Sequence, residues 1–160
     1  MKGHNLPDEH HIVRVVSYSR LQKDSDGQPI GLLFSAFQRK ENEEGLSVTW
    51  MEYFKGSRED RISAAVKAIR ASALTVGKKS GFAVGNVGGI KSVCLHQKHK
   101  IRIIYWREED NSAHAELRQF PRDDIALLER LATDTWGELI LNSSIPDGAV
   151  PAPDKLADNS

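Results

Sequence analysis

The sequence lacks the features that mark several large classes of protein. A single cysteine among 160 residues means that no disulfide can form within the chain, which is typical of a reducing compartment. The 22 basic and 22 acidic residues cancel, whereas binders of nucleic acid or of membrane surfaces usually carry a net basic footprint. No apolar run approaches the roughly 18 residues of a membrane span, and residues 1–9 lack the apolar core of a secretion signal. We therefore expect a soluble cytoplasmic protein with no membrane attachment and no nucleic-acid partner.

The patterning of apolar residues predicts one α+β domain. The length suits a single domain, and residues 1–142 are expected to form it. From 143 to 160 proline, aspartate, alanine and serine replace apolar residues, which predicts a disordered tail. β-branched and alternating apolar residues predict strands at 11–17, 46–50, 82–84, 101–106 and 113–120.

Helical periodicity predicts two main amphipathic helices, at 57–76 and 121–141. Asn86 is expected to cap a further helix that runs to about residue 96. The apolar run 31–37 is compatible with either a strand or a helix. The expected architecture is a mostly antiparallel or mixed sheet covered by the two main helices.

A glycine-rich stretch follows the strand at 82–84 and leads into the helix capped by Asn86. It is not a phosphate-binding P-loop, because isoleucine follows its last glycine where the motif needs lysine and a hydroxyl residue. A helix N-terminus can still bind an anion through free backbone N–H groups. One hypothesis is therefore an anion or nucleotide site formed by Gly85, Asn86, Gly88 and Lys91. The alternative is a closely packed strand-to-helix turn.

The six histidines do not predict a metal centre. A zinc site needs three or four ligands that converge on one ion. No two histidines have a helical HxxxH spacing with an acidic residue nearby, and Cys94 stands alone. No metal and no cofactor are expected.

Three polar residues on predicted strands form a more specific set. Arg14 lies on the first strand, Ser47 on the second and Glu116 on the last, with His114 close by. This order resembles the arrangement in ADP-ribosyltransferases. The resemblance implies that the arginine and the serine hold a nicotinamide dinucleotide. It also implies that the glutamate orients the attacking group while an oxocarbenium-like centre develops.

Short blocks along the chain also resemble a set of small uncharacterised prokaryotic proteins. The blocks are the arginine-bearing first strand, SAF at 35–37, LSV at 46–48 and NSAHAEL at 111–117. Ser112 stands where that set usually has proline. The resemblance implies no activity and transfers no catalytic residue, but such proteins often occur in prokaryotic conflict systems.

The leading functional hypothesis is a non-catalytic accessory protein that acts through a protein partner, as in a prokaryotic defence system. It rests on the lack of a complete catalytic motif and on aromatic residues that could anchor an interface. One alternative is an ADP-ribosyltransferase-like enzyme that uses a nicotinamide dinucleotide. The second alternative is the nucleotide or anion binder at the glycine-rich stretch. The aromatic residues concerned are Trp50, Tyr53, Phe54, Tyr105 and Trp106.

Overall fold

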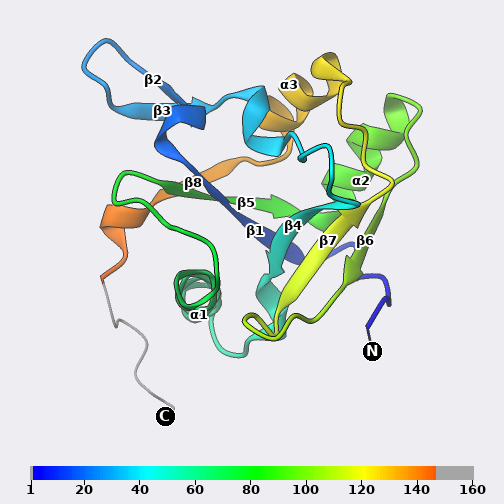
Figure 1. Ribbon diagram of the computed structural model, residues 1–160, viewed down its shortest axis with the longest axis horizontal. Coiled ribbons are helices and arrows are strands. Elements are labelled where there is room, and N and C mark those ends of the chain that lie inside the picture. The colour runs from blue at the N-terminus through cyan, green and yellow to red at the C-terminus, as the bar shows by residue number, and fades with distance from the viewer. Residues whose placement is uncertain (1, 147–160) are drawn as a thin grey trace.

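A six-stranded antiparallel sheet forms the centre of the computed structural model, which describes residues 2–146 (Figure 1). A two-stranded hairpin lies beside it, so the predicted α+β class is confirmed. The strands are β1 (His11–Val16), β2 (Leu21–Lys23), β3 (Pro29–Leu32), β4 (Gly45–Trp50), β5 (Gly81–Asn86), β6 (Arg102–Tyr105), β7 (His114–Arg118) and β8 (Glu138–Leu141). The α-helices of the described residues are α1 (Arg58–Ala71), α2 (Val87–His96) and α3 (Ile125–Asp134).

The strand order is β6-β7-β4-β1-β5-β8, and the sheet opens between its two middle strands. β1 pairs with β5 along its whole length, from His11 to Val16. β1 pairs with β4 only at Ile12 and Val13. Beyond Val13 the two strands diverge, as the blue and teal arrows of Figure 1 show. The sheet therefore consists of two halves, β8-β5-β1 and β4-β7-β6, joined over two residue pairs.

The helices cover both faces of the sheet. α1 lies on one face, where its apolar side packs against Val13 and Phe82. α2 and α3 lie on the other face and pack against Ile12 and Leu117. Burying one such aliphatic side chain contributes about 1.5–3 kcal/mol, so each face holds its helices chiefly by apolar contact. The buried helical residues include Ile62 and Ile69 of α1, Ile90 of α2 and Leu128 of α3.

Side-chain caps explain where the three helices begin. The Ser57 side chain accepts a hydrogen bond from the Asp60 amide, and the Asp60 side chain accepts one from the Ser57 amide. This is the reciprocal capping box that satisfies two otherwise free donors. The Asn86 side chain caps α2, as the sequence predicts, and Asp124 caps α3 by accepting from the Leu127 amide.

The prediction of one helix over 121–141 is wrong. α3 covers only Ile125–Asp134, and the remaining apolar residues form strand β8. The helix ends where Trp136 turns into the core and stacks on Phe37 with a ring separation of 4.9 Å. Gly137 follows, and β8 then pairs with β5. A short apolar run fits either a helix or a strand. Here it forms a strand, because it pairs with the edge of β5 that β1 leaves free.

Two other boundaries differ from the sequence expectation. α1 ends at Ala71, five residues before the predicted end, and the Ser72 hydroxyl donates to the Ile69 carbonyl. The ambiguous run 31–37 contains both structures, the end of β3 followed by a 3₁₀ turn at Phe34–Phe37.

The first residues of the predicted tail lie against α1. Arg70 donates from Nη2 to the carbonyl oxygens of Asn142, at 3.1 Å, and Ile145, at 2.8 Å. The remainder of the predicted tail, 147–160, lies outside the described residues. None of the helices within 2–146 is long and apolar enough to cross a membrane.

Gly85 of β5 is expected to be required for packing. A Cβ atom there would lie 2.9 Å from Ile90 Cδ1 and 3.0 Å from the ring of Trp136. Gly85→Ala should lower the free energy of unfolding by about 1–3 kcal/mol, because the buried neighbours must shift. Urea denaturation followed by tryptophan fluorescence measures this change.

Gly137→Ala is the matched control, because nothing lies within 4 Å of its added Cβ. Its free energy of unfolding should stay within about 0.5 kcal/mol of the parent. Equal stability of the two variants would contradict the packing role of Gly85.

Candidate functional site

A cleft of about 230 Å³ lies where β1 and β4 diverge. Its walls come from both strands, from the segment that follows α1 and from the turn that follows β3. Three of its lining side chains are basic and one is acidic, so its charge balance is positive. These charged residues are Arg14, Arg20, Lys40 and Glu43.

Arg14 lies in the gap between the two strands. Its Nε donates to the Ala36 carbonyl and its Nη1 to the Ser47 carbonyl, both at 2.7 Å. The Ser47 carbonyl points toward β1 beyond the last β1–β4 residue pair, so no strand partner reaches it. The guanidinium replaces the missing ladder hydrogen bond and links the turn after β3 to β4.

The charge of Arg14 is not balanced by a neighbouring carboxylate. Within residues 2–146 no ion pair joins it to an acidic side chain, and Glu43 is the one carboxylate whose field favours its charged form. Burial, together with the charge of Arg20, lowers the pKa of Arg14 to about 10. The group is still a cation at neutral pH. Because a half-buried cation without a carboxylate partner is costly, an anion in the cleft would be stabilised there.

Ser47 also belongs to a second cluster, formed with His114 and Glu116 of β7. In the β4–β7 ladder Ser47 is paired with Glu116, and Thr49 is paired with His114. His114 Nδ1 lies 2.7 Å from the Trp106 carbonyl. A carbonyl only accepts, so Nδ1 carries the proton. In the neutral ring Nε2 then accepts from the Ser47 hydroxyl, at 3.2 Å.

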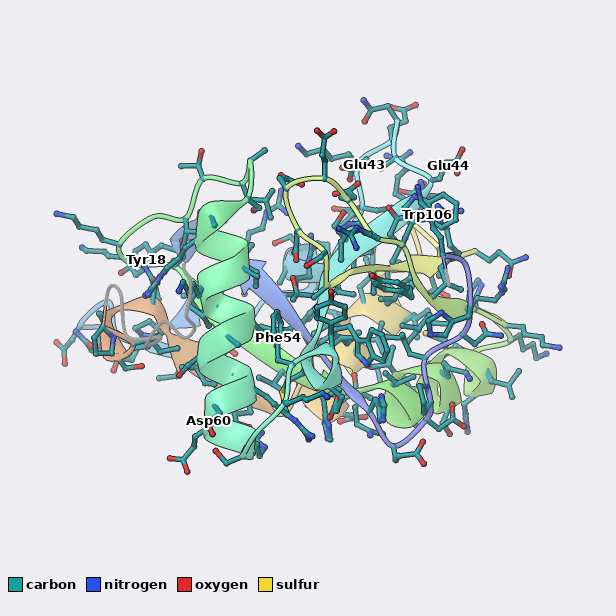
Figure 2. The ribbon with its side chains drawn as sticks, turned by 90° about the horizontal axis from the view of Figure 1, so that it is seen from below. Tyr18, Glu43, Glu44, Phe54, Asp60 and Trp106 are labelled. Carbon is teal, nitrogen blue, oxygen red and sulfur yellow. The ribbon has the colours of Figure 1, made fainter. Side chains whose placement is uncertain are left out.

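The Glu116 carboxylate is held by its neighbours on β7. Its Oε1 accepts from Arg118 Nε at 2.6 Å, and its Oε2 lies 3.8 Å from His114 Nε2. Arg118 is itself fixed, with Cζ 4.6 Å from the ring centre of Trp106 and Nη1 3.5 Å from Glu44. In Figure 2 Glu44 and Trp106 lie close together at the upper right, to one side of α1.

The structure thus places the four predicted residues in two groups that share Ser47. Arg14 and Ser47 line the cleft, whereas His114 and Glu116 are not among its lining residues. Arg14 leaves β1 on the α2–α3 face, like Ile12, and its guanidinium turns into the gap. The Ser47 hydroxyl and the Glu116 carboxylate lie on the α1 face. The two groups therefore lie on opposite faces of the sheet and are connected through Ser47, beside the gap between β1 and β4.

The predicted anion site at the glycine-rich stretch has its donors occupied. The Val87 and Gly88 amides donate to the carbonyls of His10 and Asp8, both at 2.9 Å, and the Gly89 amide donates to the Asn86 side chain. Lys91 pairs with the Asp8 carboxylate at 2.8 Å. The segment before β1 thus fills the position that an anion would take, in agreement with the packed-turn alternative.

Gly85 and Gly88 serve this packing. An added Cβ at Gly88 would lie 3.0 Å from the Asp8 carbonyl oxygen, and Gly85 has no room beside Trp136. Both glycines permit close approach of neighbouring chain, so the hypothesis of a ligand site there gains no support.

Four of the five aromatic residues expected at an interface contact one another, and the fifth, Trp106, contacts Lys2 and Arg118 instead. Trp50 lies 5.5 Å from Tyr105 and 6.0 Å from Tyr53, measured between ring centres, and Tyr53 contacts Phe54. Tyr53 is the most exposed of them, at 37%. The protein-partner hypothesis stays a prediction.

Two residues of the site were missed by the sequence reasoning. Arg118 could have been found, because it lies two residues after Glu116 and so shares its face of the strand. Glu108 comes from the loop between β6 and β7, and its Oε1 lies 3.6 Å from His114 Nε2. No sequence signal sets the conformation of that loop. The loop is held by Asn111, whose side-chain amide donates a hydrogen bond to the Thr49 hydroxyl on β4.

Comparison of the chain with protein-family models, with curated proteins and with solved structures found no match.

Cys94 is expected to be unreactive in the folded protein. Its side chain is fully buried on α2, and burial, aided by the charge of Asp124, raises the pKa of the thiol to about 12. Only the thiolate is nucleophilic. Labelling by a disulfide reagent at pH 8 should be at least about 100-fold slower in the native state than in denaturant. Rapid stoichiometric labelling of the native protein would contradict this.

Proposed function

We propose that this protein binds a nicotinamide dinucleotide in the cleft between β1 and β4 and transfers its ADP-ribose group to an acceptor. The observation that carries the proposal is the position of Ser47. Its carbonyl binds Arg14 on one side, and its side chain faces His114 and Glu116 on the other. The three strands that carry the predicted set are the first, fourth and seventh in the chain, but they are neighbours in the sheet.

Arg14 supplies the cation for the pyrophosphate. Two of its five N–H donors are used by the Ala36 and Ser47 carbonyls, which fixes the plane of the guanidinium. The remaining donors are available to phosphate oxygens, which guanidinium groups bind in a bidentate way. Arg20 and Lys40 line the same cleft and add to the attraction.

Glu116 supplies the carboxylate for the reaction itself. In ADP-ribosyl transfer the bond between nicotinamide and the ribose breaks, and its electron pair leaves with the nicotinamide. Positive charge develops at the ribose carbon, and a nearby carboxylate stabilises it. The acceptor then forms a bond to that carbon and gives up a proton. Arg118 holds one Glu116 oxygen, and Oε2 lies toward His114. Glu116 does not line the cleft, so the proposal requires the ribose to extend from the cleft past Ser47 to reach Oε2.

His114 fixes the Ser47 hydroxyl beside that carboxylate. Because Nδ1 donates to the Trp106 carbonyl, the ring is held in place, and Nε2 accepts a hydrogen bond from the Ser47 hydroxyl. The oxygen of Ser47 is then free to accept a hydrogen bond from a ribose hydroxyl.

Dinucleotide binding should raise the melting temperature through Arg14. A ligand at 100 times its dissociation constant adds about 2.7 kcal/mol of stability. Arg14→Lys keeps the charge but loses the fork geometry, so the shift relative to its own ligand-free melt should largely disappear. Arg102→Lys on β6, outside the cleft, should keep the full shift. Equal shifts in both variants would contradict binding at Arg14.

Glu116→Gln should remove the transfer step while leaving binding in place. Nicotinamide release, with water or a protein extract as acceptor, is the readout. The variant should lower kcat by about 100-fold or more and change KM little, because the lost charge acts on the transition state. Glu44→Gln, which alters a different contact of Arg118, should keep near-parental kcat. Absence of nicotinamide release by the parent protein under these conditions would refute the proposal.

A further inference from the structure

Four potential ligand atoms surround one point at the junction of β4, β7 and the loop before β7. His114 Nε2 lies 3.2 Å from Ser47 Oγ, 3.6 Å from Glu108 Oε1 and 3.8 Å from Glu116 Oε2. The ligand atoms of Glu108, His114 and Glu116 all lie within 4.8 Å of one another. In tetrahedral zinc sites, bond lengths of about 2.0–2.2 Å place neighbouring ligand atoms about 3.3–3.6 Å apart. The observed separations from Nε2 are close to this range.

We propose that Glu108, His114 and Glu116 form a site for a divalent transition-metal ion of the zinc type, with Ser47 Oγ or water as the fourth ligand. His114 and Glu116 come from β7 and Glu108 from the loop before it, and Ser47 is on β4, so the tertiary fold completes the site. The absence of a metal motif in the sequence is consistent with this, because no two of these residues have a helical ligand spacing.

The imidazole is oriented as a metal ligand requires. Its side chain is only 6% exposed. Nδ1–H donates to the Trp106 carbonyl, which is the outer contact that commonly fixes the tautomer of a metal-binding histidine. The Nε2 lone pair then points toward Glu108 and Glu116. Both carboxylate oxygens lie beyond normal hydrogen-bonding distance of Nε2, at separations that an ion shared by the three ligands would bridge.

The carboxylates are arranged to receive a cation. Arg118 binds Oε1 of Glu116 and leaves Oε2 toward Nε2, in the way that outer contacts orient a ligating carboxylate. The Glu108 side chain is 48% exposed, so an ion can reach the buried nitrogen from that side. With two carboxylates beside one arginine, the site has net negative charge before an ion binds.

The donor set selects the class of ion. Ca²⁺ and Mg²⁺ prefer coordination by oxygen alone, whereas a nitrogen ligand with carboxylates suits Zn²⁺ and its first-row neighbours. One consequence rests on the proposed function. A bound ion would occupy the Glu116 oxygen needed for ADP-ribosyl transfer, so Zn²⁺ would inhibit the enzyme reversibly.

Cobalt titration of the full chain, prepared without a histidine tag, tests the site directly. Co²⁺ in a tetrahedral site absorbs visible light, and Zn²⁺ should displace it with 1:1 stoichiometry. Glu108→Gln should weaken binding by at least about tenfold, since even outer contacts of a metal site are worth about 10–100-fold. His114→Ala should abolish binding. Glu109→Gln, an exposed neighbour outside the cluster, is the matched control and should bind like the parent.

The proposal is overturned if the parent protein gives no cobalt spectrum, or if His114→Ala and Glu108→Gln bind as tightly as Glu109→Gln. Binding that survives in His114→Ala would place the ion on another histidine. Glu108→Gln should lose the inhibition of nicotinamide release by Zn²⁺, measured relative to its own metal-free rate, whereas Glu109→Gln should keep it. The titration needs no dinucleotide, so the metal site and the proposed transferase activity can fail independently.

Discussion

The half-buried guanidinium of Arg14 holds together the two strands that frame the site. Where β1 and β4 diverge, the Ser47 carbonyl has no strand partner, and a buried carbonyl without a partner costs stability. Arg14 satisfies it and also holds the Ala36 carbonyl, so the gap remains open without leaving these acceptors unbonded. The cleft and its positive charge both follow from this arrangement.

The second half of the site follows from the pairing of β4 with β7. Each residue pair in the ladder places two side chains on one face, so Ser47 faces Glu116 and Thr49 faces His114. The loop before β7 then supplies the Trp106 carbonyl and the Glu108 carboxylate around the same imidazole. Glu116 has a role in both proposals: it stabilises positive charge during ADP-ribosyl transfer in one and binds a metal ion in the other.

Much of the fold could be predicted from the sequence, because local patterns determine it. Alternation predicts β4 and β7, and the capping residues Ser57 and Asn86 predict the starts of α1 and α2. The error lies at 121–141, where the apolar run fits a helix until Trp136 packs on Phe37. That contact joins positions far apart in the chain, so no local pattern contains it. The predicted anion site lost its support for the same reason, since Asp8 reaches it from a distant segment.

For the site, local patterns are enough to place Arg14 on the first strand, Ser47 on a middle strand, and His114 and Glu116 on a late strand. That these strands are neighbours, and that β1 separates from β4 beyond Val13, depends on contacts between distant segments. Only the tertiary structure decided that Glu108 faces His114. The physical reason is that strand order and the path of a loop depend on hydrogen bonds and packing between distant segments, which alternation and spacing within one segment do not encode.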